Sequence, residues 1–311
     1  MKNKKSIIEK RFAKVKQEMD KEISQRLTTE ILPSGIVKET HNYFDPKQKM
    51  NELNVYYPQG TSKPLPLIID IHGGGWVSGD KELNRNFCMH LSKYNFVVIS
   101  MSYRLCVPHT IYDQIIDLFC CYRYIIIHAH EMFIDLNRIY LSGDSAGGML
   151  ALFTYAIMQN KRLQDGLCMN EHPFFKQNLK MVIHALQLNH PVPYMHSINL
   201  TKNKIINRIA IKFLLKLFVG NKKTFLYKNV SFEDYEDLIE YPPIFIVSSE
   251  GDKHFKEQSF RLYKDLKQKG SLVEFNFNKN SKLEHVYNVI YPDKDEALIV
   301  NKEIIDFFNK Y

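Results

Sequence analysis

The chain lacks the features that would place it in a membrane or outside the cell. Its 311 residues contain no uninterrupted apolar run of roughly 18 residues, the length that a membrane-spanning helix needs. The basic N-terminus, Met1-Lys2-Asn3-Lys4-Lys5, is not followed by the apolar segment of a secretory signal peptide. The five cysteines have neither a Cys-x-x-Cys spacing nor the even number of a disulfide framework. We therefore predict a cytoplasmic protein with reduced cysteines.

Acidic residues are absent from one segment, residues 201–230, which contains eight lysines and arginines. This excess equals the net charge of the whole chain, +8. Four of the basic residues are spaced by four and form a stripe on a predicted helix: Lys204, Arg208, Lys212 and Lys216. We expect the apolar residues between them to cover a pocket, and weak association with an anionic membrane surface is the alternative. No recognition motif accompanies the charge, so we predict no nucleic-acid partner.

The apolar pattern predicts strands that alternate with helices along most of the chain. The runs 65–71 and 96–101 are almost entirely apolar, as in strands buried on both faces. Further strands are predicted at 35–41, 52–57, 138–142, 181–185, 244–248 and 272–277, and helices at 112–130, 146–158, 256–268 and 296–308. The alternation predicts one α/β domain, residues 1–311, with a mostly parallel sheet covered on both faces. An amphipathic helix at 1–30 and an insertion at about 186–240 are expected to form a cap.

Glycine is scarce, with 13 residues in the chain, and two short strings that each follow a predicted strand are rich in it. The first is His72-Gly73-Gly74-Gly75-Trp76, and the second is Gly143-Asp144-Ser145-Ala146-Gly147-Gly148. A Gly-x-Ser-x-Gly string is typical of a strand–turn–helix elbow that exposes a serine nucleophile. Successive glycines let main-chain N–H groups approach a developing oxyanion. Together the strings predict acyl-transfer chemistry with Ser145 as the nucleophile.

A serine nucleophile needs a base and an acid, which follow this kind of elbow later in the chain, the acid first. Asp252 follows the predicted strand 244–248, and His285 follows the strand 272–277. Both therefore lie beyond the C-terminal ends of strands, where open α/β sheets bind ligands. Glu250 is a rival for the acid and His254 a rival for the base. We favour His285 because His254 lies on the acid's own loop.

Other polar residues near these motifs receive structural interpretations. His72 is interpreted as a residue that orients the glycine loop and not as the base, and Asp144 as a second residue that orients this loop. Arg104 and Asp117 are expected to brace loops through charge-assisted hydrogen bonds. Most other histidines, including His190, are interpreted as surface or structural residues.

On these motifs the chain resembles the hormone-sensitive-lipase-like branch of the α/β-hydrolase superfamily, from about residue 50 to the C-terminus. The matching residues are His72 to Trp76, Tyr103-Arg104-Leu105, Asp117, Gly143 to Gly148, Pro242-Pro243, Asp252 and His285. The resemblance implies an eight-stranded α/β-hydrolase fold with a helical cap, and a carboxylic-ester hydrolase whose triad is Ser145, Asp252 and His285. It also implies an oxyanion hole formed by the N–H groups of Gly73, Gly74 and Ala146, with no metal and no organic cofactor.

The chain departs from the family pattern at three places. Asp252-Lys253-His254 stands where members often have Asp-Pro-Leu, Val286-Tyr287 where they have Gly-Phe, and Cys106-Val107-Pro108 where they have Ala-Pro-Glu. These departures leave the substrate open within the expected class, small short- to medium-chain esters cleaved through an acyl-enzyme. Two other functions stay open: a catalytically silent small-molecule-binding protein, and an amidase or peptidase with the same triad.

Overall fold

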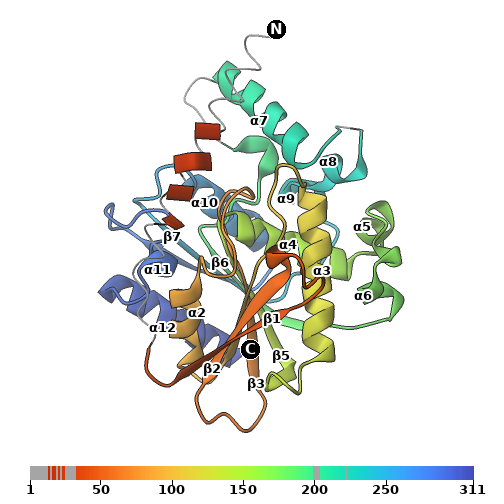
Figure 1. The fold of residues 1–311 in the computed structure, drawn as a ribbon. Helices are drawn as coiled ribbons and strands as arrows, with labels where there is room; N and C mark the ends of the chain where they lie inside the picture. The colour runs from red at the N-terminus through yellow and green to blue at the C-terminus, as the bar shows by residue number, and fades with distance from the viewer. Residues whose placement is uncertain are drawn as a thin grey trace.

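An eight-stranded sheet forms the centre of the protein (Figure 1). The structure, a computed structural model, describes residues 13–14, 16–18, 20–21, 23–24, 33–198, 204–221 and 223–311. The strands are β1 (Ile36–Asn42), β2 (Glu52–Pro58), β3 (Leu65–Ile71), β4 (Val97–Met101), β5 (Ile134–Asp144), β6 (Ile183–Asn189), β7 (Ile244–Ser249) and β8 (Val273–Asn278). Their order is β1-β2-β4-β3-β5-β6-β7-β8, antiparallel at β1-β2-β4 and parallel from β4 to β8. The predicted α/β-hydrolase fold, with its mostly parallel eight-stranded sheet, is confirmed.

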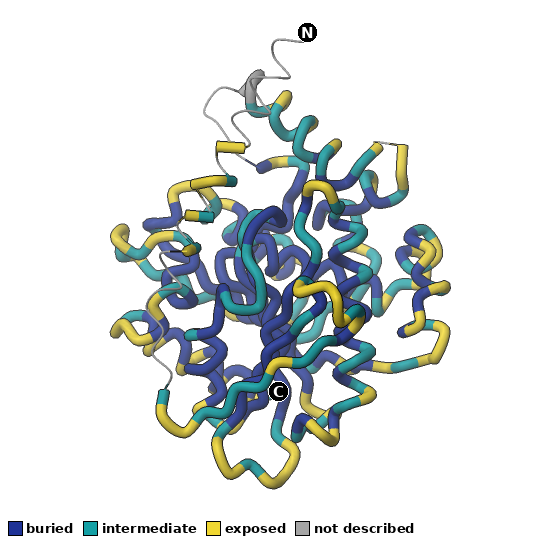
Figure 2. The backbone as a smooth tube through the Cα atoms, in the orientation of Figure 1, coloured by how far each residue is buried: buried dark blue, intermediate teal, exposed yellow. Residues whose placement is uncertain are grey.

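Helices cover both faces of the sheet, because successive side chains of its inner strands point to opposite sides. Leu67 and Ile69 of β3 pack in one core with α3, α4 and α10, whereas Ile68 packs in a second core with α2 and α12. Figure 2 shows the resulting buried interior along the sheet. The helices are α2 (Arg85–Ser92), α3 (Ile111–Ile127), α4 (Ala146–Gln159), α5 (Lys161–Gly166), α6 (Pro173–Lys176), α7 (Lys204–Phe218), α8 (Phe225–Asn229), α9 (Phe232–Tyr235), α10 (Lys256–Gln268), α11 (Tyr287–Ile290) and α12 (Asp295–Lys310). Short 3-10 turns lie at Lys49–Asn51, Met169–Glu171 and Met195–Ser197.

Two strands differ from the prediction by several residues, since β5 begins at Ile134 and not at residue 138, and β6 extends beyond residue 185. The sequence predicts a strand at 181–185 and an insertion from about residue 186, but β6 runs from Ile183 to Asn189. The C-terminal part of β6 was not predicted because it contains the polar residues Gln187 and Asn189, and a buried strand is expected to be apolar. These two residues are fully buried and satisfy one another, with Gln187 Nε2 donating to Asn189 Oδ1 at 2.8 Å. The inserted segment therefore begins after Asn189.

The inserted segment carries α7, α8 and α9, which lie above the sheet in Figure 1. Helix α7 packs an apolar face on the residue that ends the glycine loop, since the rings of Phe218 and Trp76 are 6.0 Å apart. Arg208 and Lys212 of the basic stripe are exposed. An apolar side chain of α7 therefore contacts Trp76, while these two basic side chains face water.

The predicted N-terminal helix is only partly covered by the structure. The described residues between 13 and 24 are helical, and the rest of the segment 1–30 lies outside the described residues. Asp20 forms an ion pair with Lys16 at 2.7 Å and accepts a hydrogen bond from the hydroxyl of Ser78. Ser78 lies in the turn that follows the glycine loop, so this part of the N-terminal segment lies against the loop.

Candidate active site

Ser145 stands alone between the end of β5 at Asp144 and the start of α4 at Ala146. Its backbone has φ 52° and ψ −115°, a conformation that costs a non-glycine residue strain energy. Hydrogen bonds hold it on both sides: its N–H donates to the Asn189 carbonyl at 2.9 Å, and its carbonyl accepts from the Val192 N–H at 3.1 Å. The strand–turn–helix elbow expected from the sequence is therefore present, with the serine partly exposed.

The glycines of the elbow allow α4 to rest directly on main-chain atoms. A Cβ atom on Gly147 would lie 1.9 Å from the carbonyl oxygen of Ile71, the last residue of β3. A Cβ atom on Gly143 would lie 2.6 Å from the carbonyl oxygen of Gly147. Neither position has room for a side chain. The elbow and the end of β3 are consequently fixed to one another by backbone contact.

The glycine loop after β3 is anchored by Asp144, the residue before the serine. The N–H of Gly73 donates to Asp144 Oδ1 at 2.8 Å, and Asn84 Nδ2 donates to the same oxygen at 2.6 Å. Asp144 therefore orients the glycine loop, in agreement with its interpretation from the sequence. The N–H of Gly73 is already directed at this carboxylate, so it is not free to serve an oxyanion. This corrects the expectation for Gly73.

Several main-chain N–H groups of the glycine loop and of the start of α4 have no acceptor within the described part of the chain, among them those of Gly74, Gly75 and Ala146. Gly74 and Gly75 have φ angles of 89° and 57°, and a Cβ atom on Gly74 would lie 2.1 Å from the Ser78 carbonyl oxygen. Ala146 is the first residue of α4, where unpaired N–H groups and the helix dipole favour negative charge. These donors border the elbow from two elements.

His72 is fully buried against the glycine loop, and its Nδ1 lies 2.9 Å from the carbonyl oxygen of Gly73. Its ring stacks on Tyr103 with centroids 4.2 Å apart, and the Tyr103 hydroxyl donates to the His72 carbonyl at 2.6 Å. His72 thus supports the loop, in agreement with its interpretation from the sequence.

His285 and Asp252 form a hydrogen-bonded pair beyond the ends of β8 and β7. Nδ1 of His285 lies 2.7 Å from Oδ2 of Asp252, which is only 1% exposed. Burial by itself would raise the pKa of Asp252, but the hydrogen bond and charge of His285 bring that pKa below its usual value. The carboxylate therefore stays ionised and holds the proton on Nδ1, which leaves Nε2 as the basic nitrogen.

The two rivals for these roles are engaged elsewhere. The side chain of His254 is exposed, and only its backbone N–H reaches Asp252, at 3.3 Å. The carboxylate of Glu250 forms an ion pair with Lys256. The structure thus brings together Asp252 and His285, the pair favoured from the sequence.

The structure does not join His285 to Ser145 by a hydrogen bond. Nε2 of His285 is buried and has no partner among the residues that the structure describes. The segments that carry the two residues nevertheless approach one another. The N–H of Ser145 donates a hydrogen bond to the carbonyl of Asn189, and the ring of the next residue, His190, lies 5.4 Å from that of His285. Catalytic hydrogen bonds of this kind often tighten only when substrate binds. Sequence reasoning missed His190, because no motif distinguishes it from the other histidines.

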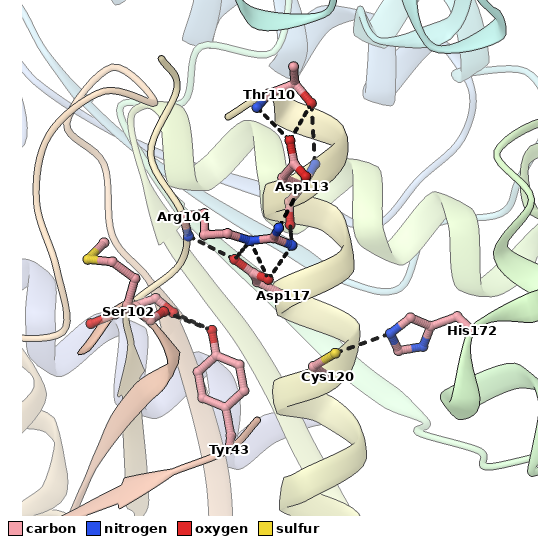
Figure 3. A network of polar contacts seen from close by, with 9 residues as sticks. Tyr43, Ser102, Arg104, Thr110, Asp113, Asp117, Cys120 and His172 are labelled. Carbon is pink, nitrogen blue, oxygen red and sulfur yellow. Dashed lines mark hydrogen bonds and ion pairs between the residues drawn. The ribbon is translucent and has the colours of Figure 1, made fainter. Parts of the chain in front are cut away.

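Arg104 links the loop after β4 to α3 (Figure 3). Its guanidinium donates to both oxygens of Asp117 at 2.7 to 3.0 Å and to Asp113 Oδ1 at 3.2 Å. Asp113 also forms a capping box with Thr110 at the start of α3. The bracing expected of Arg104 and Asp117 is therefore seen in the structure.

The cysteines form no disulfide. Four are buried, Cys168 is exposed, and all five are free. Burial raises the pKa of Cys120 to about 11, so this thiol stays protonated beside His172. Within the described ranges, no group of three or more His, Cys, Asp or Glu side chains is arranged to hold a metal ion. No helix in that part of the chain combines the length and apolar character needed to cross a bilayer.

A buried acid beneath the loop makes stability depend on pH. Asp70 of β3 is fully buried, and burial together with the nearby charge of Asp144 raises its pKa to about 7. Since the folded-state pKa exceeds the unfolded value, Asp70 stabilises the fold when protonated, and this contribution is lost as the pH rises through 7. The unfolding free energy of Asp70→Asn minus that of wild type is therefore expected to rise by about 2–3 kcal/mol from pH 5 to pH 8.

Denaturant unfolding of both proteins at several pH values measures this difference. Asp293→Asn, at an exposed position, is the matched control for the loss of a carboxylate. A difference between Asp70→Asn and wild type that does not change with pH would mean that Asp70 is ionised in the folded protein across this range.

The eight-stranded sheet, the serine elbow and the paired histidine and aspartate beyond β7 and β8 define an α/β hydrolase. Within that class the chain belongs to the BD-FAE family, whose model matches residues 53–266. Esterase LipI of Mycobacterium tuberculosis is 36% identical over 87 residues, which are 28% of this chain and 27% of the relative. Across eight curated relatives, the match spans 22% to 38% of the relative's own length.

Solved structures match over nearly the whole chain. Esterase B from Lactobacillus rhamnosis has a TM-score of 0.88 at 26% identity, with 100% of this chain and 96% of that chain covered. The same esterase has also been solved inhibited by a C4-C4 tributyrin phosphonate. An esterase of the bacterial hormone-sensitive lipase family has the same fold, with a TM-score of 0.70, 19% identity and coverage of 94% and 90%. The predicted place in the α/β-hydrolase superfamily is confirmed.

Proposed function

We propose that this protein is a serine esterase that cleaves carboxylic esters through an acyl-enzyme intermediate. The observation that carries the proposal is the strained elbow of Ser145 at the sheet edge where His285 pairs with Asp252. The backbone of Ser145 stores strain that the neighbouring hydrogen bonds and glycine contacts maintain. Similarity to esterases over the whole fold supports the class of reaction.

In the first half of the reaction, the hydroxyl oxygen of Ser145 attacks the ester carbonyl carbon while its proton passes to Nε2 of His285. The ionised Asp252 stabilises the imidazolium through the hydrogen bond at Nδ1. The carbonyl oxygen becomes an oxyanion, which accepts hydrogen bonds from the N–H groups of Gly74, Gly75 and Ala146. The carbon–oxygen bond to the alcohol then breaks, and His285 returns its proton to the leaving oxygen.

In the second half, water attacks the acyl-enzyme and loses a proton to Nε2 of His285, and the same N–H groups hold the second oxyanion. The bond to Ser145 oxygen breaks, the serine recovers its proton, and the carboxylic acid leaves. Gly73 does not donate in either half, because Asp144 holds its N–H. Its role is to fix the direction of the loop.

The space beside Trp76 favours the shorter acyl chains within the expected range of short- to medium-chain esters. Helix α7 nearly fills this space and leaves a cavity of about 10 Å³, close to the size of one water molecule. Its lining is apolar throughout: Trp76, Met195, Ile198, Ile211, Leu214, Leu215 and Phe218. A longer acyl chain would have to displace α7, which costs packing free energy.

Phe218→Ala is therefore expected to raise the ratio of kcat/KM for p-nitrophenyl octanoate over butyrate by about tenfold, since each buried methylene contributes about 1 kcal/mol. A graded series of p-nitrophenyl esters measures the ratio. Ile209→Ala, on the same helix but 42% exposed, is the matched control and should leave the ratio unchanged. An unchanged ratio in Phe218→Ala would place the acyl chain elsewhere.

A fluorophosphonate probe tests the class of function directly, because it reacts with activated serines. We expect one label per chain, located at Ser145 by peptide mass spectrometry. Absence of labelling would favour a silent binding protein on the same fold. Rates on matched ester and anilide substrates distinguish an esterase from an amidase or peptidase.

A further inference from the structure

His190 is a fully buried histidine that contacts the His285–Asp252 pair but has no part in the proposed proton transfers. It follows β6 directly, with a φ angle of 47°. Its ring lies edge-to-face against that of His285, with centroids 5.4 Å apart and planes at 75°. Burial above all, with the neighbouring charge of His285, lowers the pKa of His190 to about 3. His190 is therefore neutral wherever the enzyme works.

A hydrogen-bond relay connects His190 to the loop that carries His285. Nε2 of His190 lies 3.1 Å from the hydroxyl oxygen of Ser249, and this hydroxyl donates to the Leu283 carbonyl at 2.7 Å. Because the hydroxyl has one hydrogen and gives it to Leu283, His190 must be the donor and carry its proton on Nε2. Leu283 lies two residues before His285, so the relay restrains the backbone of that loop.

The ring of His285 needs such support. One hydrogen bond, from Nδ1 to Asp252, fixes one corner of the ring but leaves it able to tilt about that bond. Two neighbouring rings limit the tilt: Phe255, at 5.0 Å and 53°, and His190. An error of about 1 Å in the position of Nε2 is enough to lower the rate about 100-fold.

We propose that His190 is a positioning residue that holds both the ring and the loop backbone of His285, so that Nε2 stays directed at the Ser145 hydroxyl. This role rests on the proposed esterase function. It requires an aromatic ring and an N–H donor in the same side chain. Each property can be removed while the other is kept.

His190→Phe keeps the ring and removes the donor, whereas His190→Gln keeps a donor and removes the ring. In both variants we expect kcat for p-nitrophenyl butyrate, divided by the number of active sites titrated with a fluorophosphonate, to fall about tenfold to 100-fold. KM should stay within about twofold, because His190 does not contact substrate. A residue needed only for folding would lower the number of titrated sites and leave kcat per site unchanged.

Ser249→Ala breaks the relay from its other end while His190 stays in place, so it tests the proposal even where a His190 variant fails to fold. Its kcat per site should fall about as much as that of His190→Phe, and the double variant should fall no further than His190→Phe. His172→Phe is the matched control, since His172 is a buried histidine that packs on Phe119 of α3 and contacts none of the proposed site residues in the described part of the chain. It should keep the wild-type kcat per site.

Wild-type kcat per site in His190→Phe, His190→Gln and Ser249→Ala would overturn the positioning role while leaving the esterase proposal intact. The opposite failure is equally distinct. If the wild-type protein neither hydrolyses esters nor labels at Ser145, the proposed function fails, and the role of His190 fails with it.

Discussion

Ser145→Ala is expected to lower kcat for p-nitrophenyl butyrate by about 10⁴- to 10⁶-fold, since removing a serine nucleophile in such triads has effects of this size. The substitution deletes the only atom that forms the covalent bond to the acyl group, while the N–H donors of Gly74, Gly75 and Ala146 remain in place. The residual rate should reflect those donors and substrate binding. Steady-state kinetics with the alanine variant measures the loss.

The fold should survive the change, because alanine meets the same backbone strain at φ 52° and the contacts of Gly143 and Gly147 are untouched. A circular dichroism melt that matches wild type establishes this. Ser62→Ala, in an exposed loop, is the matched control and should keep full activity. Turnover near the wild-type rate in Ser145→Ala would remove the acyl-enzyme mechanism altogether.

Asp252→Asn is expected to lower kcat by about 10³- to 10⁴-fold at neutral pH with little change in KM. Asparagine has nearly the same shape as aspartate, but its amide N–H₂ can donate to Nδ1 of His285. This favours the tautomer with the proton on Nε2, which then cannot accept the proton of Ser145. The pKa of Asp252 lies below its usual value, so the wild-type carboxylate is ionised throughout the neutral range.

Glu250→Gln is the matched control, because Glu250 lies two residues before Asp252 and pairs with Lys256 instead of His285. Its kcat should stay within a few-fold of wild type. If Glu250→Gln were inactive and Asp252→Asn active, the role of the acid would pass to Glu250. Both variants are measured on the same ester under saturating substrate.

Much of the site could be predicted from sequence because several of its parts depend on short, contiguous stretches of residues. The elbow around Ser145 needs glycines at fixed positions, and mostly apolar runs indicate the strands of the sheet that carries it. The choice between His285 and His254 is less direct, since both come after Asp252 in the chain. It depends on how the loop after β8 approaches β7, and the 2.7 Å contact with Asp252 exists only in the folded chain.

The oxyanion donors show a different limit of sequence reasoning. Three consecutive glycines indicate that the backbone can approach a ligand closely, but they do not indicate which of the N–H groups is free to donate. Gly73 is occupied by the carboxylate of Asp144, which is 71 residues away in the chain. The polar pair Gln187 and Asn189 hid the end of β6 for a similar reason, since the partner that satisfies a buried amide is invisible in a local pattern.

The backbone contact between Gly147 and Ile71 restricts which parts of the protein can change by substitution. No side chain sets the spacing between the serine elbow and the end of β3, so no exchange of side chains can adjust it. Helix α7, by contrast, lines the cavity beside Trp76 with apolar side chains alone, those of Ile211, Leu214, Leu215 and Phe218. If the protein is the proposed esterase, substitutions along α7 can therefore change its ester preference while the spacing between the serine elbow and β3 stays the same.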